Sequence, residues 1–232
     1  MAEPPGVSVI IPCWHDEVPL ARLLGQLAAC PPPLQVVVVD AAQSAACRLL
    51  CRQHGALWLA SRPCRGAQLR QGAAQAQHAA LWFLHADAEL YGDPLAALRA
   101  ALGAGAAGGY FAFRFAGAPP WQGRLLAWLV NRRTGFGVPY GDQGLFAARS
   151  AYFAAGQHAP WPLFEEVPLV RGLRRLGAFR RLAPGVLVDP RRWQRDGWWR
   201  RALRNRLLAL GFALGVSPAS LARRYRTRRG AS

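Results

Sequence analysis

The chain has 232 residues, 52% of them hydrophobic, and a formal net charge of +17 from 29 basic and 12 acidic residues. This composition excludes a disordered chain and is typical of one large globular domain, with or without a small appendage. Every basic residue is arginine, which excludes a lysine P-loop, a lysine Schiff base and a lysine general base. The excess positive charge predicts a polyanionic partner: a nucleotide, a phosphorylated substrate, nucleic acid or an anionic membrane surface.

The cysteines and the N-terminus indicate the compartment. An odd number of cysteines without a CxxC pair predicts reduced, mostly buried thiols rather than a disulfide framework or a zinc site. They are Cys13, Cys30, Cys47, Cys51 and Cys64. The first residues lack the basic and apolar regions of a signal peptide, and no apolar run reaches the roughly 18 residues of a transmembrane helix. We therefore expect a cytoplasmic protein.

The first hundred residues alternate short apolar runs with helical patterns. Strands are expected at 7–11, 34–39, 56–60 and 81–84, and helices at 16–30, 44–55, 68–78 and from about residue 93. Strands and helices that alternate at this spacing predict parallel βαβ units. This part of the chain is therefore expected to be Rossmann-like.

The second half is less regular. After a glycine-rich loop at 103–109, strands are expected at 110–115, around Phe146 and at 180–188, and helices at 121–132 and 168–176, with a loop at 135–144. An amphipathic helix at 198–214 and a short final helix at 218–225 are expected to form a C-terminal appendage, and the tail at 226–232 is expected to be disordered. We predict one α/β domain over 1–232, with a mostly parallel central sheet flanked by helices.

Acidic side chains follow three of the predicted strands. Asp16 follows the first strand, Asp40 ends the second, and Asp87 follows the strand at 81–84. Because ligands of open α/β sheets bind beyond the carboxyl ends of the strands, we expect these acids along one ligand-binding edge. Asp40 suits ribose hydroxyls and a base N–H, and Asp87 suits a metal on a diphosphate. The alternative for Asp87 is an ordinary loop or N-cap residue.

Two further acidic motifs lie in the second half. Glu165 and Glu166 follow an apolar run at the start of a helix, where they either stabilise the helix dipole or supply a general base. The turn at 141–144, with Asp142 and Gln143 between two glycines, allows a close backbone approach to a ligand, although a plain turn has the same composition.

Several arginines stand where they could bind an anion. Arg65 and Gln68 precede a helix rich in small residues, where a phosphate could meet the helix N-terminus. Arg191 and Arg192, followed by Trp193, could clamp a diphosphate that the indole shields from water. Solvated surface arginines are the alternative in each case. Arginines and leucines alternate in the helix at 198–214, which either lies on a membrane or packs on its own domain or a second subunit.

The order of these motifs resembles the family 2 glycosyltransferases of the GT-A fold over nearly the full chain. Within that family it is most similar to small bacterial transferases associated with selenium metabolism. The matching segments are RG-x-Q at 65–68, FLHAD at 83–87, PYGDQ at 139–143 and RRW at 191–193. The resemblance implies a selenosugar synthase activity of selenoneine-type biosynthesis. A sugar would move from a UDP-sugar, preferably UDP-N-acetylglucosamine, to selenophosphate with formation of a C–Se bond.

The resemblance also implies roles for individual residues. Residues 1–100 would form the nucleotide-binding half, 101–195 the acceptor half and 196–225 the C-terminal helices. The nucleotide sugar would be bound by Pro12, Asp16, Asp40, Arg65, Gln68, His85, Asp87, Asp142 and Gln143. Asp87 would hold a divalent Mg or Mn ion, Glu165 or Glu166 would face the acceptor, and Arg191, Arg192 and Trp193 would bind the leaving diphosphate or the acceptor. The catalytic set would be Asp87, Glu165, Glu166 and Arg192.

The sequence departs from the family pattern at two acidic positions. His85 replaces the first Asp of the usual metal motif, so metal dependence stays open and arginines could do part of the work of the metal. The usual Asn-Glu after the first strand is His15-Asp16. A lipid-phosphate acceptor at a membrane surface is the alternative to selenophosphate. A homodimer is compatible with the sequence, and nucleic-acid binding is the least favoured class.

Overall fold

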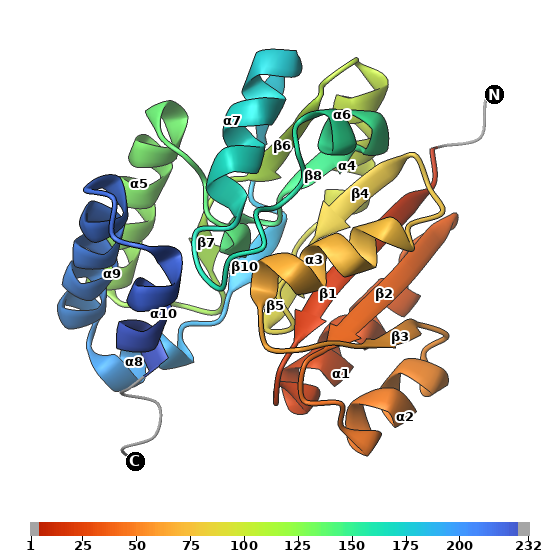
Figure 1. Ribbon diagram of the computed structural model, residues 1–232, viewed down its shortest axis with the longest axis horizontal. Coiled ribbons are helices and arrows are strands. Elements are labelled where there is room, and N and C mark those ends of the chain that lie inside the picture. The colour runs from red at the N-terminus through yellow and green to blue at the C-terminus, as the bar shows by residue number, and fades with distance from the viewer. Residues whose placement is uncertain (1–4, 227–232) are drawn as a thin grey trace.

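A computed structural model of the chain describes residues 5–226, which form two sheets with helices packed around them (Figure 1). The larger sheet has seven strands in the order β3-β2-β1-β4-β8-β6-β9, and the smaller has three in the order β5-β10-β7. The strands are β1 (Val7–Cys13), β2 (Leu34–Asp40), β3 (Leu57–Ala60), β4 (Ala80–Phe83), β5 (Ala88–Leu90), β6 (Gly108–Phe111), β7 (Arg114–Phe115), β8 (Phe146–Ala148), β9 (Phe179–Leu182) and β10 (Val186–Val188).

Ten α-helices connect or cover these strands within the described residues. They are α1 (Glu17–Ala28), α2 (Ala45–Gln53), α3 (Arg65–Ala74), α4 (Pro94–Gly103), α5 (Trp121–Phe136), α6 (Arg149–Ala154), α7 (Glu166–Leu176), α8 (Arg191–Asp196), α9 (Trp198–Ala213) and α10 (Pro218–Arg226). A short 3-10 helix, η1 (Gly141–Gln143), precedes β8. The mostly parallel sheet flanked by helices confirms the predicted fold class.

The first four strands confirm the predicted βαβ arrangement. β1 pairs in parallel with β2 on one side and β4 on the other, and β2 pairs in parallel with β3. Alternate residues of β1 face opposite layers: Val9 and Ile11 pack with α1 and α2, and Ile10 packs with α3. Because helices cover both faces of β1, residues that point to either face are apolar, and the strand reads as a continuous apolar run.

The second half contains elements that the sequence pattern did not predict. The predicted strand at 110–115 divides into β6 and β7, and that at 180–188 into β9 and β10, with the two parts of each in different sheets. In residues 110–115 the alternating pattern continues across the crossover, so periodicity alone could not locate it, whereas Pro184 and Gly185 between β9 and β10 were an available turn signal. β5, α6 and α8 were also not predicted, and α3 begins at Arg65 rather than at residue 68.

The C-terminal helices pack against the second half of the chain. Phe212 of α9 stacks on Phe164 at 4.7 Å between ring centroids, and Leu221 of α10 is buried in the same cluster. None of the helices in the described part of the chain is long and apolar enough to cross a membrane. The tail at 227–232, predicted to be disordered, lies outside the described residues.

Candidate active site

Strand pairing brings distant segments to one edge of the larger sheet. β8 runs antiparallel to β4, with Trp82 opposite Phe146, so η1 lies at the edge where β4 ends. β10 runs antiparallel to β5, with Val188 opposite Ala88, and this pairing places the start of α8 beside the segment that follows β4. The loops after β1 and β4, η1 and the segment from 189 to 192 therefore converge at one edge.

Arg192 lies at the centre of this convergence. Its Nη2 atom is 3.5 Å from Oδ2 of Asp87 and 3.7 Å from Oδ1 of Asp16. All three side chains are partly exposed, so each can turn toward a ligand without leaving a buried charge unpaired. Residues predicted from three separate segments thus form one charged cluster.

Two cavities meet at this cluster. The β1-side cavity, of about 150 Å³, is lined by Pro12, Asp16, Arg65, Gln68, Asp87 and Arg192. The α9-side cavity, of about 190 Å³, is lined by Asp87, Asp142, Glu166, Arg192, Trp193 and Arg201. Arg65, His85, Asp87 and Arg192 contact both. The arrangement suits a charged group placed between two ligand parts, one in each cavity.

Arg65 connects the two acidic motifs at the back of the site. Its Nε donates to Oε1 of Glu165, whose side chain is buried, and its Nη1 lies 3.4 Å from Nε2 of His85. Burial and the Arg65 charge lower the pKa of His85 to about 3, so the imidazole is neutral at pH 7. Since a guanidinium only donates, Nε2 of His85 accepts and its proton is on Nδ1.

Two carboxyl groups of the α9-side cavity have raised pKa values. Burial and the neighbouring Glu165 raise the pKa of Glu166 to about 8. Burial raises the pKa of Asp142 to about 6, an effect that the Asp87 carboxylate strengthens and Arg65 opposes. At pH 7 Glu166 is therefore mostly a neutral acid that can donate a hydrogen bond, and the cavity carries less negative charge than its composition indicates.

The glycines of the RG-x-Q segment and of the 141–144 turn allow close packing between segments. A side chain on Gly66 would come within 1.9 Å of the carbonyl oxygen of Ala159, and one on Gly141 within 3.1 Å of Nε2 of His85. Gly144 has φ +57, a left-handed conformation that glycine adopts without strain. These glycines allow the segments that carry Arg65, His85 and Asp142 to pack closely, while the direct approach of the 141–144 turn to a ligand stays a prediction.

Asp40 and Gln143 are placed differently from the sequence prediction. The carboxylate of Asp40 is fully buried and accepts hydrogen bonds from the amides of Ala42 and Ser44 at 2.8 Å and from the Trp58 indole at 3.3 Å. Gln143 is buried and donates to the carbonyl of Phe111 at 3.2 Å. Neither lines either cavity. Each makes hydrogen bonds to the backbone, which composition and spacing do not reveal.

Gln68 and Arg191 have partners of their own. The Gln68 amide donates to the carbonyls of Cys13 and Val39 and so joins the ends of β1 and β2, although its side chain still contacts the β1-side cavity. Arg191 is exposed and pairs with Asp189 at 2.5 Å. It lines a separate surface pocket beside Asp16 and Asp87 rather than either cavity.

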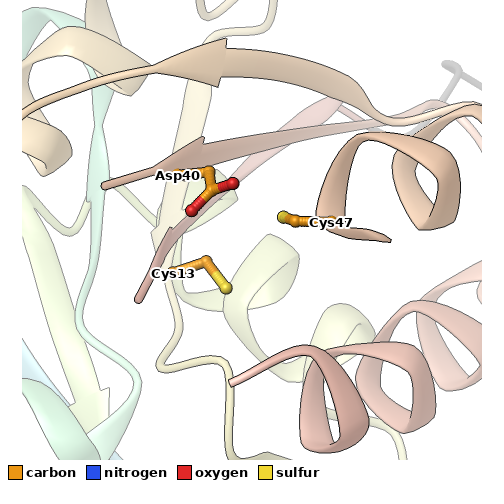
Figure 2. Close-up of side chains that lie close together, drawn as sticks. All are labelled: Cys13, Asp40 and Cys47. Atoms are coloured by element: carbon orange, nitrogen blue, oxygen red, sulfur yellow. The ribbon is translucent and has the colours of Figure 1, made fainter. Parts of the chain in front are cut away.

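Asp40 also belongs to a buried group of potential metal ligands. Figure 2 shows its carboxylate and the sulfurs of Cys13 and Cys47 turned toward one another, and these ligand atoms lie within 4.8 Å of each other. Three ligands are one fewer than a structural zinc site requires, and both oxygens of Asp40 already accept hydrogen bonds. The group therefore fits a packed thiol cluster better than a metal centre.

The α9-side cavity fits a divalent cation better than the buried group of Cys13, Asp40 and Cys47 does. Asp87 and Asp142 both line the α9-side cavity, and the charge of Asp87 raises the pKa of Asp142, so the two carboxylates are near enough to interact. Carboxylate oxygens are the ligands that Mg²⁺ and Mn²⁺ prefer. His85 does not fit as a ligand because its Nε2 faces Arg65.

The C-terminal helices contribute residues that the sequence analysis missed. Arg201 of α9 lines the α9-side cavity, and Tyr225 of α10 lines both cavities. Arg201 donates to Asp196 at 2.6 Å and to the Tyr225 hydroxyl at 3.2 Å, while its buried Nε has no partner among the described residues. The spacing of Arg201, Asn205 and Leu208 on one helical face was the available signal.

Comparisons with known proteins agree on the fold. The sequence pattern of Glycosyl transferase family 2 matches residues 8–160. No curated protein matches the whole sequence closely enough to be significant. Among solved structures, S. aureus TarS aligns with TM-score 0.60 and 13% identity over 79% of this chain and 36% of TarS. The chain thus spans about a third of that protein.

Two other similar structures were solved with nucleotides. Glucosyl-3-phosphoglycerate synthase from Mycobacterium tuberculosis, in complex with Mn²⁺, UDP and glucosyl-3-phosphoglycerate, aligns with TM-score 0.58 and 17% identity over 78% of this chain and 71% of that one. The mannosyltransferase PcManGT from Pyrobaculum calidifontis, in complex with GDP-Man and Mn²⁺, aligns with TM-score 0.59 and 20% identity over 79% of this chain and 56% of that one. At identities of 13% to 20%, these alignments show that the folds are similar and nothing more.

Proposed function

Because this chain belongs to glycosyl transferase family 2, we propose that it transfers a sugar from a UDP-sugar, preferably UDP-N-acetylglucosamine, to selenophosphate. The family makes the chain an enzyme that uses a nucleotide sugar. The observation that carries the proposal is the position of Arg192 between Asp16 and Asp87, where two cavities meet. The segments FLHAD, PYGDQ and RRW, which resemble those of the selenium-associated transferases, support selenophosphate as the acceptor.

The β1-side cavity would hold the nucleotide, with Pro12, Asp16 and Gln68 around it. The diphosphate would then lie beside Arg65 and Arg192, the arginines common to both cavities. A divalent cation on Asp87 and Asp142 would neutralise charge on the diphosphate when bound. Arginine is well suited to this position because its planar guanidinium can bind two phosphate oxygens at once.

The α9-side cavity would hold an anionic acceptor. Arg65, Arg192 and Arg201 line it, and Glu166 keeps its proton at pH 7 because burial raises its pKa. A general base must be ionised before it acts, and a sugar hydroxyl acceptor needs one. Selenophosphate is already anionic and nucleophilic, so a protonated Glu166 can donate a hydrogen bond to it instead. Glu165 does not line the cavity and pairs with Arg65.

The transfer would be one displacement. The selenium lone pair forms a bond to the anomeric carbon while the bond from that carbon to the diphosphate oxygen breaks, and UDP leaves with the electron pair. A single displacement inverts the anomeric configuration. Arg192 stabilises the charge that develops on the leaving oxygen, the kind of interaction that lowers a barrier most.

The test is a product assay with the purified protein, UDP-N-acetylglucosamine and selenophosphate, followed by mass spectrometry, with and without Mn²⁺ or Mg²⁺. We expect UDP and a selenium-linked sugar phosphate in equal amounts. If UDP is released only with another acceptor, the acceptor is wrong. If no UDP-sugar releases UDP with any acceptor, the donor assignment is wrong as well.

A lipid phosphate is the second candidate acceptor, favoured by the exposed leucines of α9, whose opposite side lines the α9-side cavity. The same arginines would bind its phosphate group. Replacing selenophosphate with a short-chain polyprenyl phosphate in the same assay separates the two acceptors, since only one is expected to give a product.

A further inference from the structure

Helix α9 presents an apolar stripe to solvent along its whole length. Its members recur every three or four residues and are 48% to 76% exposed. They are Trp199, Leu203, Leu207, Leu210 and Leu214, the last directly after the helix ends. The opposite side of α9 packs against Phe164 through Leu208 and Phe212. The stripe is therefore not needed to pack α9 against its own domain.

Helix α5 adds a second stripe beside the first. Trp121, Leu125, Trp128 and Leu129 are between 37% and 58% exposed and lie on one side of the helix. Trp121 contacts Trp199 at 5.9 Å between ring centroids. Figure 1 shows α5 and α9 side by side at one end of the molecule, away from β1 to β3. We call the two stripes together the α5–α9 face.

The charges around this face have one sign. Neither α5 nor α9 contains an aspartate or glutamate, and together they contain seven arginines. Arg124, Arg132, Arg200 and Arg206 are exposed, and none of them has an ion-pair partner among residues 5–226. Arg132 lies over the ring of Trp128 at 5.1 Å. Leucine, tryptophan and arginine in this arrangement match the composition of helices that lie in a membrane interface.

We propose that the α5–α9 face binds the surface of an anionic membrane. The leucines would enter the boundary of the acyl chains, the tryptophans would lie at headgroup level, and the arginines would contact lipid phosphates. A second copy of the chain explains the face less well, because a two-fold interface places the same surface on both sides. Arginines would then face arginines with no acid from α5 or α9 between them, whereas an anionic membrane compensates their charge.

Membrane binding would place the acceptor cavity close to lipid. Arg201, Asn205 and Leu208 line the α9-side cavity from the inner side of α9, and Leu203, Leu207 and Leu210 lie on its outer side. A helix with its side chains is roughly 10 Å across, so the cavity would lie about that far from the membrane surface. The α5–α9 face would bind the membrane in the same way with either acceptor.

The test is flotation of the purified full chain with vesicles, in the absence of any nucleotide sugar. We expect binding to equimolar phosphatidylglycerol and phosphatidylcholine vesicles and little binding to phosphatidylcholine alone, with a decrease as salt is raised. L203E/L207E should lower the partition coefficient at least about tenfold, because both leucines enter the apolar boundary. The control L49E/L176E changes the charge equally at leucines that are 54% and 51% exposed on α2 and α7.

Equal flotation of the two double variants would overturn the proposal, as would the absence of wild-type binding to anionic vesicles at low salt. Light scattering after size exclusion supplies the second measurement, and a monomer is expected. A dimer that L203E/L207E dissociates and L49E/L176E does not would assign the face to a second copy instead. Because no sugar transfer is measured, a failed product assay leaves this result unaffected.

Discussion

Glu166 offers the most direct test of the site, through the substitution Glu166→Gln. The native side chain is buried, and burial together with Glu165 raises its pKa from 4.5 to about 8. The folded protein therefore holds a proton that the unfolded chain releases near pH 4.5. One such proton changes the free energy of unfolding by about 1.4 kcal/mol per pH unit, or roughly 5 kcal/mol across the whole window.

The sign follows from the direction of the shift. The neutral acid is favoured in the folded state, so the stability is fully present below about pH 4.5 and falls as pH rises toward about 8. Glutamine keeps the shape of the protonated acid and does not titrate, so this part of the slope should disappear in Glu166→Gln. Asp142 titrates in both proteins, so most of its own contribution cancels in the difference, and the part by which its charge raises the pKa of Glu166 is measured together with Glu166.

Urea unfolding followed by tryptophan fluorescence, repeated from about pH 5 to about pH 8.5, measures the slope. Glu89→Gln, at an exposed position of β5, is the matched control and should keep the wild-type slope. Transfer activity gives a second readout. With an anionic acceptor, Glu166→Gln should retain activity within about tenfold, whereas removal of a general base should cost about 100-fold or more. Parallel stability profiles for wild type and variant would refute the buried, protonated state.

Three further predictions concern the charges around the cavities. Arg192→Ala should lower turnover at least about 100-fold because it removes stabilisation of the leaving group. Arg191→Ala changes a residue outside both cavities and should lower turnover much less. Initial rates of UDP release measure both effects. Asp87→Asn should weaken Mn²⁺ binding, measured by electron paramagnetic resonance, and an unchanged affinity would show that the ion is held elsewhere. Arg65→Ala should destabilise the fold by about 3–5 kcal/mol by leaving buried Glu165 unpaired, and the double variant with Glu165→Ala should recover part of that loss in urea unfolding.

The sequence was sufficient to predict the βαβ half and the sheet edge at which Asp16 and Asp87 meet. Short β-branched runs and helical spacing depend on local physics, so β1 to β4 lie close to their predicted ranges. The convergence of Asp16 and Asp87 followed from a general property of parallel sheets, and the structure brings both to Arg192. Their roles in binding and catalysis stay predictions.

The remaining features depend on contacts between distant segments. The backbone amides that bind Asp40 belong to its own loop, so a buried cap and a ligand contact have the same sequence pattern. The helical spacing of Arg201, Asn205 and Leu208 shows that they share one side of α9, but it does not show that this side lines a cavity. Tyr225 reaches the site only through the return of α10 over α9, which no local pattern predicts.

The smaller sheet explains why Arg192 lies where it does. Val188 of β10 is paired with Ala88 of β5, one residue after Asp87, and Leu187 is paired with Arg114 of β7. Backbone hydrogen bonds therefore fix the start of α8 beside Asp87 independently of the ion pair. Partly exposed pairs of this kind contribute little to stability, so the Arg192–Asp87 pair is not needed to hold the fold, and we expect the charge of Arg192 to serve the reaction. A loss of activity in Arg192→Ala with an unchanged melting temperature would distinguish these roles.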